Sequence, residues 1–125
     1  MTAPKPASAP LVLVAEDEDV VRELVVRCLV YEGYSVLTAP DGLAALALLQ
    51  SLEEPVDVLV ADIRMPRLSG DQLGRMALDG GLARRVLFMT GYTDHAEATG
   101  ALGPVLKKPF HPDALCEAVK AVIAA

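Results

Sequence analysis

Short apolar runs alternate with stretches of helical period along most of the chain, and this alternation decides the fold class. The apolar runs predict strands at residues 11–15, 34–38, 56–61, 85–89 and 104–107. The periodic stretches predict helices at 19–31, 42–52, 70–78 and 112–123, with one or two further helical turns within 93–99. Strands that alternate with helices form a parallel sheet with helices on both faces and right-handed crossovers. The pattern therefore predicts a single doubly wound α/β domain.

Size and composition agree with one such domain, at residues 11–125. The chain has 125 residues, a net charge of −6 and no basic stripe, which argues against direct binding to nucleic acid. No apolar run is long enough to cross a membrane, and residues 1–10 are typical of a flexible Pro- and Ala-rich leader rather than a signal peptide. Cys28 and Cys116 lie in helical patterns at positions that look apolar, so we expect two buried, reduced thiols in a cytoplasmic protein.

Two positions carry local signals for helix ends. Asp41 precedes the predicted helix 42–52 and is a candidate N-cap. Gly33 follows the predicted helix 19–31, and a glycine just past a helix end commonly stops it.

Four of the predicted strands end in polar side chains. Four consecutive acids, residues 16–19, follow the first strand, Asp62 follows the third, Thr90 follows the fourth, and Lys107-Lys108 follow the fifth. The carboxyl ends of parallel strands share one edge of the sheet, and ligands bind at that edge. We therefore expect the acids, the hydroxyl and a lysine to converge on one site.

These groups suit phosphoryl chemistry with a metal ion. Glu16, Asp17 and Asp62 would repel one another, so a proton or a cation must compensate their charge. Mg²⁺ prefers oxygen ligands and commonly takes one or two carboxylates together with phosphate oxygens. A carboxylate can also attack phosphorus, while Lys108 and Thr90 could stabilise the charge on the transferred group.

Four sequence motifs in this order resemble the receiver domains of response regulators in bacterial two-component signalling. The motifs are Glu16-Asp17-Glu18, Asp62-Ile63-Arg64-Met65-Pro66 with Gly70, Thr90-Gly91, and Lys108-Pro109-Phe110. The resemblance extends over about residues 10–124. It implies a flavodoxin-like receiver fold, whose five strands have the order 2-1-3-4-5.

The resemblance also implies a role for each strand-end residue. Asp62 would accept a phosphoryl group from a histidine kinase or a histidine phosphotransfer protein. Thr90 would be the switch hydroxyl, and Lys108 the cation that pairs with the phosphoryl group. Lys108 is preferred to Lys107 because it precedes Pro109, and we expect the Lys108–Pro109 bond to be cis, so that Lys108 turns back toward Asp62.

The same resemblance implies a Mg²⁺ site beside Asp62, which would itself be a ligand. Asp17 would bind the ion directly, and Glu16 would act on it through water. The backbone carbonyl of Arg64 would be a further ligand from the protein.

Three features differ from the usual receiver pattern. Glu16 stands where the family often has aspartate, and Val105 stands near the position of the usual switch aromatic. The 17 residues between Thr90 and Lys108 form a short interval for the family, so we expect an abbreviated or irregular fourth helix. Partner choice would then depend on the first helix, 19–31.

The resemblance implies a phosphoacceptor module that phosphorylates and dephosphorylates itself and is not a metabolic enzyme. The Met1 start favours a stand-alone response regulator, and the receiver segment of a hybrid histidine kinase is the other arrangement. The downstream partner is an unknown protein. An alternative is a Mg²⁺-dependent phosphohydrolase with an aspartyl nucleophile, which would need a general acid where this chain has Arg64. A mononucleotide- or flavin-binding module would need a Gly- or Ser/Thr-rich phosphate loop where four acids stand.

Overall fold

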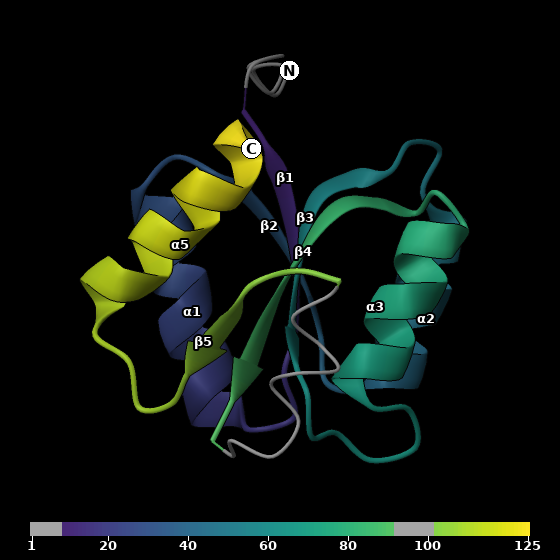
Figure 1. Cartoon of the computed structure of the whole chain (residues 1–125), viewed down its shortest axis with the longest axis horizontal. Coiled ribbons are helices and arrows are strands. Elements are labelled where there is room, and N and C mark those ends of the chain that lie inside the picture. The colour runs from purple at the N-terminus through teal and green to yellow at the C-terminus, as the bar shows by residue number, and fades with distance from the viewer. Residues whose placement is uncertain (1–8, 92–101) are drawn as a thin grey trace, which may run out of the picture.

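The computed structural model describes residues 9–91 and 102–125, which form a parallel sheet of five strands with helices on both faces (Figure 1). The strand order is β2-β1-β3-β4-β5, which confirms the predicted order. The strands are β1 (Leu11–Ala15), β2 (Ser35–Ala39), β3 (Val56–Asp62), β4 (Ala83–Thr90) and β5 (Val105–Lys107). The helices are α1 (Asp19–Tyr31), α2 (Gly42–Ser51), α3 (Gly70–Asp79) and α5 (Pro112–Ala124).

The central strands are buried on both faces of the sheet. Helices α1 and α5 cover one face, and α2 and α3 cover the other (Figure 1). Successive side chains of a strand point to opposite faces, so each central strand needs apolar residues at nearly every position. In β1, Val12 and Val14 join the core under α1 and α5, whereas Leu13 and Ala15 join the core under α2 and α3. This double burial explains the continuous apolar runs of the sequence.

The predicted helices and strands are confirmed, with small differences at their ends. Strand β2 begins at Ser35 rather than at residue 34, because the Tyr34 amide donates to the Leu29 carbonyl (3.1 Å) and belongs to the end of α1. Strand β4 begins at Ala83, two residues before the predicted start, although the side chains at 84–85 are exposed. The apolar pattern reports the burial of side chains, whereas the strand is defined by backbone pairing. The turns predicted at 93–99 lie outside the described residues.

Both local helix signals are confirmed. The Asp41 side chain accepts a hydrogen bond from the Ala44 amide (2.8 Å) and caps α2. Gly33 has a φ of 94°, which a residue with a side chain rarely adopts, and it directly follows Glu32, the C-cap residue of α1. Cys28 and Cys116 are free thiols, but both are half-buried rather than buried as expected, because they lie at the edge of the contact between α1 and α5, where the Cys116 Sγ is 3.9 Å from the Cys28 carbonyl oxygen.

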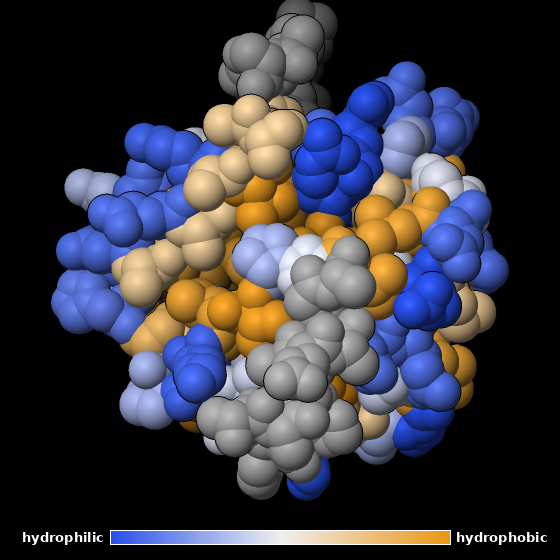
Figure 2. Space-filling model, in the orientation of Figure 1, coloured by the Kyte–Doolittle hydropathy of each residue, from blue (hydrophilic) through white to orange (hydrophobic). Residues whose placement is uncertain are grey.

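The surface of the described residues is mostly hydrophilic on the outer sides of the helices. Figure 2 shows hydrophobic surface beside α5 and over the edge strand β5. Within residues 9–91 and 102–125, no helix is both long and apolar enough to span a membrane.

Candidate functional site

The sheet register brings the carboxyl ends of four strands to one edge. Ala15, the last residue of β1, pairs with Ala61, so Glu16 lies beside Asp62 at the end of β3. Thr90, the last residue of β4, pairs with Lys107 at the end of β5. The predicted convergence of these strand ends is therefore confirmed.

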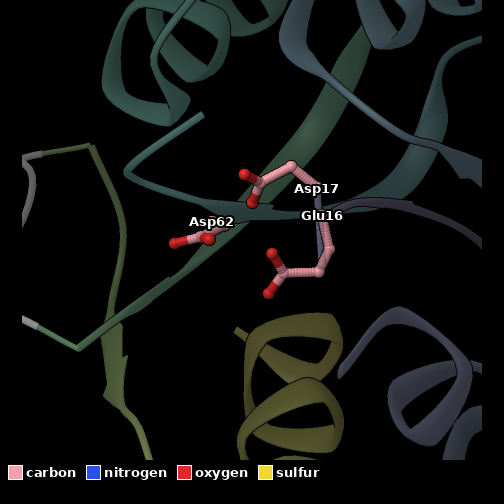
Figure 3. A group of neighbouring side chains, drawn as sticks. All are labelled: Glu16, Asp17 and Asp62. Atoms are coloured by element: carbon pink, nitrogen blue, oxygen red, sulfur yellow. The ribbon is translucent and has the colours of Figure 1, made fainter. Parts of the chain in front are cut away.

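Three carboxylates meet at this edge. Glu16, Asp17 and Asp62 each offer an oxygen, and these oxygens lie within 4.8 Å of one another. Figure 3 shows Glu16 and Asp17 at the end of β1, with Asp62 facing them from the neighbouring strand. Oxygen ligands at this spacing fit a hard divalent cation such as Mg²⁺.

The three carboxylates differ in their access to solvent. Glu16 is fully buried and Asp62 is 5% exposed, whereas Asp17 is exposed. A cavity of about 390 Å³ opens beside them and is lined by Asp17, Glu18, Asp62, Arg64, Gly91 and Lys108. An ion or a phosphoryl group can thus approach from the side of Asp17, and Glu16 closes the inner end of the site.

Lys108 connects the buried carboxylates. Its ammonium group lies 2.5 Å from Glu16 Oε1, 3.1 Å from Asp62 Oδ2 and 3.8 Å from Glu18 Oε1. Its backbone amide donates to the Thr90 carbonyl (2.7 Å), and the Lys108–Pro109 bond is cis, as predicted. The preference for Lys108 agrees with this geometry, because Lys107 is exposed.

The electrostatics of the site follow from this burial. The pKa of Glu16 is raised to about 8, mainly by burial and then by the hydrogen bond with Asp62, while Lys108 acts in the opposite direction. Burial alone would lower the pKa of the Lys108 ammonium, but its hydrogen bond with Glu16 and the charge of Asp62 raise it above its ordinary value. Near neutral pH, the metal-free site therefore compensates its negative charge with a proton on Glu16 and the ammonium of Lys108.

Two other predicted residues lie close by. Thr90 is buried at the end of β4. The Arg64 amide donates to Asp62 Oδ1 (3.3 Å) and so helps to orient that carboxylate.

Val105 is half-buried in β5 and pairs with Phe88, so no aromatic side chain occupies this position of the strand.

One contact of the site was not predicted. The Arg22 side chain, on the first turns of α1, donates from Nη1 to the Glu16 carbonyl oxygen (2.8 Å). In the sequence, Arg22 looks like an ordinary charged residue of a helix surface. The nearest signal is Asp19 three residues before it, a spacing that favours an ion pair.

Known receiver proteins are similar to this chain over nearly its whole length. The family model for the response regulator receiver domain matches residues 12–120. The response regulator receiver protein CpdR of Brucella abortus is 36% identical over 119 residues, which are 91% of this chain and 98% of CpdR. The sensor kinase CckA of the same organism is 35% identical over 116 residues, which are 90% of this chain but 12% of CckA.

A solved structure agrees with the sequence matches. The response regulator TrrA of Thermotoga maritima, in complex with Mg²⁺ and BeF, is 29% identical and superposes with a TM-score of 0.79, covering 90% of this chain and 98% of TrrA. The fold, the strand order and the acidic site at the strand ends agree with these matches. The chain belongs to the response regulator receiver domain family of two-component signalling.

Proposed function

We propose that this domain accepts a phosphoryl group on Asp62 from the phosphohistidine of a histidine kinase or a histidine phosphotransfer protein. The observation that carries the proposal is the position of Asp62: its carboxylate lies beside two further acids and within 3.1 Å of the Lys108 ammonium. A nucleophile, candidate metal ligands and a fixed cation are the parts that phosphoryl transfer to a carboxylate needs.

The transfer step forms one bond to phosphorus and breaks another. An Asp62 oxygen attacks phosphorus and forms a P–O bond, giving an acyl phosphate. The P–N bond to the donor histidine breaks, and its electron pair returns to the imidazole. Lys108 is placed to pair with a phosphoryl oxygen, and Thr90 comes from the next strand end, where its hydroxyl could donate to another.

Mg²⁺ fits the acidic end of the site, where Glu16, Asp17, Asp62 and the Arg64 carbonyl would hold it. The donors are hard oxygens, and Asp62 adds to the effect of burial in raising the pKa of Glu16, so the two acids compete for a compensating charge. When bound, the ion would neutralise charge on the transferring phosphoryl group. In the family the phosphorylated state is read by another protein, and we propose that a shift of Thr90 toward the phosphoryl group transmits the signal.

The proposal is the same for a stand-alone cytoplasmic regulator and for the receiver segment of a hybrid histidine kinase. CpdR aligns with 91% of this chain and the sensor kinase CckA with 90%. The aligned region makes up 98% of CpdR but only 12% of CckA. The length of the natural open reading frame distinguishes these two arrangements.

Intact-mass analysis after incubation with acetyl phosphate and Mg²⁺ tests the proposal. The parent protein should gain one phosphoryl mass, and Asp62→Asn should gain none. Asp57→Asn is the matched control, because Asp57 lies on the same strand at the opposite edge, where it accepts from the Leu11 amide (2.8 Å). Undiminished labelling of Asp62→Asn, or equal labelling in excess chelator, would refute the assignment.

A further inference from the structure

The turn between β1 and α1 carries two of the three clustered acids but has little local support from helix capping. Glu18 is the N-cap residue of α1, and its side chain makes no capping hydrogen bond. By contrast, the Asp41 side chain caps α2. Asp17 is exposed, so packing against neighbouring side chains does not fix its direction.

Arg22 reaches back from α1 and holds this turn at two points. Its Nη1 donates to the Glu16 carbonyl oxygen (2.8 Å), and its Nη2 contacts Asp19 Oδ1 (2.5 Å). The Arg22 side chain is 20% exposed, whereas the Asp19 side chain is 82% exposed. The contact with the Glu16 carbonyl is therefore the better shielded of the two, because Glu16 is fully buried.

The Glu16 carbonyl belongs to the same rigid unit as the Asp17 amide. The peptide group is planar, so the carbonyl of one residue and the N–H and Cα of the next move together. A donor that fixes the Glu16 carbonyl thereby fixes the orientation of the peptide from which the Asp17 side chain projects. Planar guanidinium groups suit this task because their donors have fixed directions.

We propose that Arg22 is a positioning residue for metal binding, which holds the Glu16–Asp17 peptide so that the Asp17 carboxylate faces Asp62. This inference rests on the proposed function, because it concerns the same Mg²⁺ site. In the part of the chain that the structure describes, Arg22 contacts the Glu16 carbonyl and Asp19, but not the carboxylates of Asp17 and Asp62. Its effect is on the affinity for the ion rather than on the chemistry of transfer.

A Mg²⁺ titration of the unphosphorylated protein, followed through backbone amide NMR shifts, tests this role. Arg22→Met keeps much of the apolar stem and removes both donors. It should raise the Mg²⁺ dissociation constant about tenfold, as is typical when a group that orients a metal ligand is lost. Amide hydrogen exchange at Asp17 in the metal-free protein should also become faster.

Two further variants separate geometry from charge. Arg27→Met removes an exposed arginine from the same helix and should leave the dissociation constant near that of the parent. Arg22→Lys keeps the charge but not the paired donors, so its dissociation constant should lie between those of the parent and Arg22→Met. In saturating Mg²⁺, the rate of phosphorylation of Arg22→Met should approach that of the parent.

The outcomes distinguish this inference from the proposed function. If the parent neither binds Mg²⁺ near Asp17 nor becomes phosphorylated, the proposed function fails. If the parent does both and Arg22→Met binds Mg²⁺ as tightly as Arg27→Met, the inference about Arg22 is overturned. Loss of the fold in both Arg22→Met and Arg22→Lys, while Arg27→Met folds, would also overturn it by showing that Arg22 supports the whole domain.

Discussion

Glu16 is the residue at which burial and charge conflict most. It is fully buried beside Asp62, and its carboxylate contacts the Lys108 ammonium (2.5 Å). The pKa of about 8 means that the folded, metal-free protein keeps a proton on Glu16 over a range where the unfolded chain has lost it. The charge of this residue is thus linked to folding.

The pH dependence of stability follows from this linkage. The pKa of Glu16 is about 8 in the folded protein, whereas the ordinary value, which applies to the unfolded chain, is 4.5. Between these two pH values the folded state therefore binds more protons at Glu16 than the unfolded state does. Its contribution to the free energy of unfolding is therefore fully present below about pH 4.5 and is lost as the pH rises toward 8. Between about pH 5 and pH 8, the free energy of unfolding of the metal-free parent should fall on the order of 2 kcal/mol further than that of Glu16→Gln.

Urea denaturation in excess chelator measures this difference. Glu16→Gln keeps the size of the side chain but cannot titrate, so its stability should change less over the same range. Equal losses in the two proteins would show that another group carries the pH dependence.

At the scale of single elements, the sequence predicted more about helix starts than about strand ends. The start of α1 at Asp19, the cap at Asp41 and the start of α5 at Pro112 were all correctly predicted. The start of β4 was not, since backbone pairing continues past exposed arginines. The convergence of the acids, Thr90 and Lys108 was predictable because parallel strands share an edge. The contact of Arg22 was not, because a charged helix residue usually has no role beyond solvation.

The start of α3 is packed directly against the end of β3, where Asp62 lies. The Gly70 amide donates to the Ile63 carbonyl (2.8 Å), and a Cβ at residue 70 would lie 2.1 Å from the Asp62 carbonyl oxygen. Gly70→Ala must therefore push α3 and the end of β3 apart. We expect it to destabilise the fold by about 1–3 kcal/mol and to slow phosphorylation of Asp62.

Thermal denaturation and acetyl phosphate labelling check both effects. Gly91→Ala is the steric control for stability, because a Cβ there would meet nothing within 4 Å. If Gly70→Ala were as stable as Gly91→Ala, the close approach of α3 to β3 would have no energetic consequence.

The start of α2 combines a cap with an ion pair. Asp41 accepts from the Ala44 amide through Oδ1 (2.8 Å), and its Oδ2 lies 3.2 Å from Arg67 Nη1 in the turn before α3. Asp41→Ala should lower the free energy of unfolding by about 1 kcal/mol, mainly through loss of the cap. Asp41→Ser keeps a capping oxygen but not the pair, so urea denaturation should show a much smaller loss. A loss as large as that of Asp41→Ala would assign the stabilisation to the pair with Arg67.

At the scale of the whole molecule, the site exists only because distant segments meet. Lys108 is 46 residues from Asp62 and 92 residues from Glu16 in the sequence. The strand order 2-1-3-4-5 places β1 next to β3, with β4 and β5 following toward one edge. An unfolded chain has no such cluster of oxygens, so binding of an ion at this site is coupled to folding.

Mg²⁺ should therefore stabilise the whole fold, and Asp17 should set the size of the effect. An ion that binds only the folded state adds about 2.7 kcal/mol when its concentration is 100 times the dissociation constant. Asp17→Asn removes a negative charge beside Asp62 in the cluster of three carboxyl groups, so it should raise the melting temperature without metal and weaken the gain from Mg²⁺. Thermal denaturation in chelator and in a Mg²⁺ series measures both, with Asp79→Asn, at the exposed end of α3, as the control. A metal-free Asp17→Asn that melts below the parent would show instead that the Asp17 carboxylate stabilises the turn by hydrogen bonding, and that this contribution exceeds the repulsion between the acids.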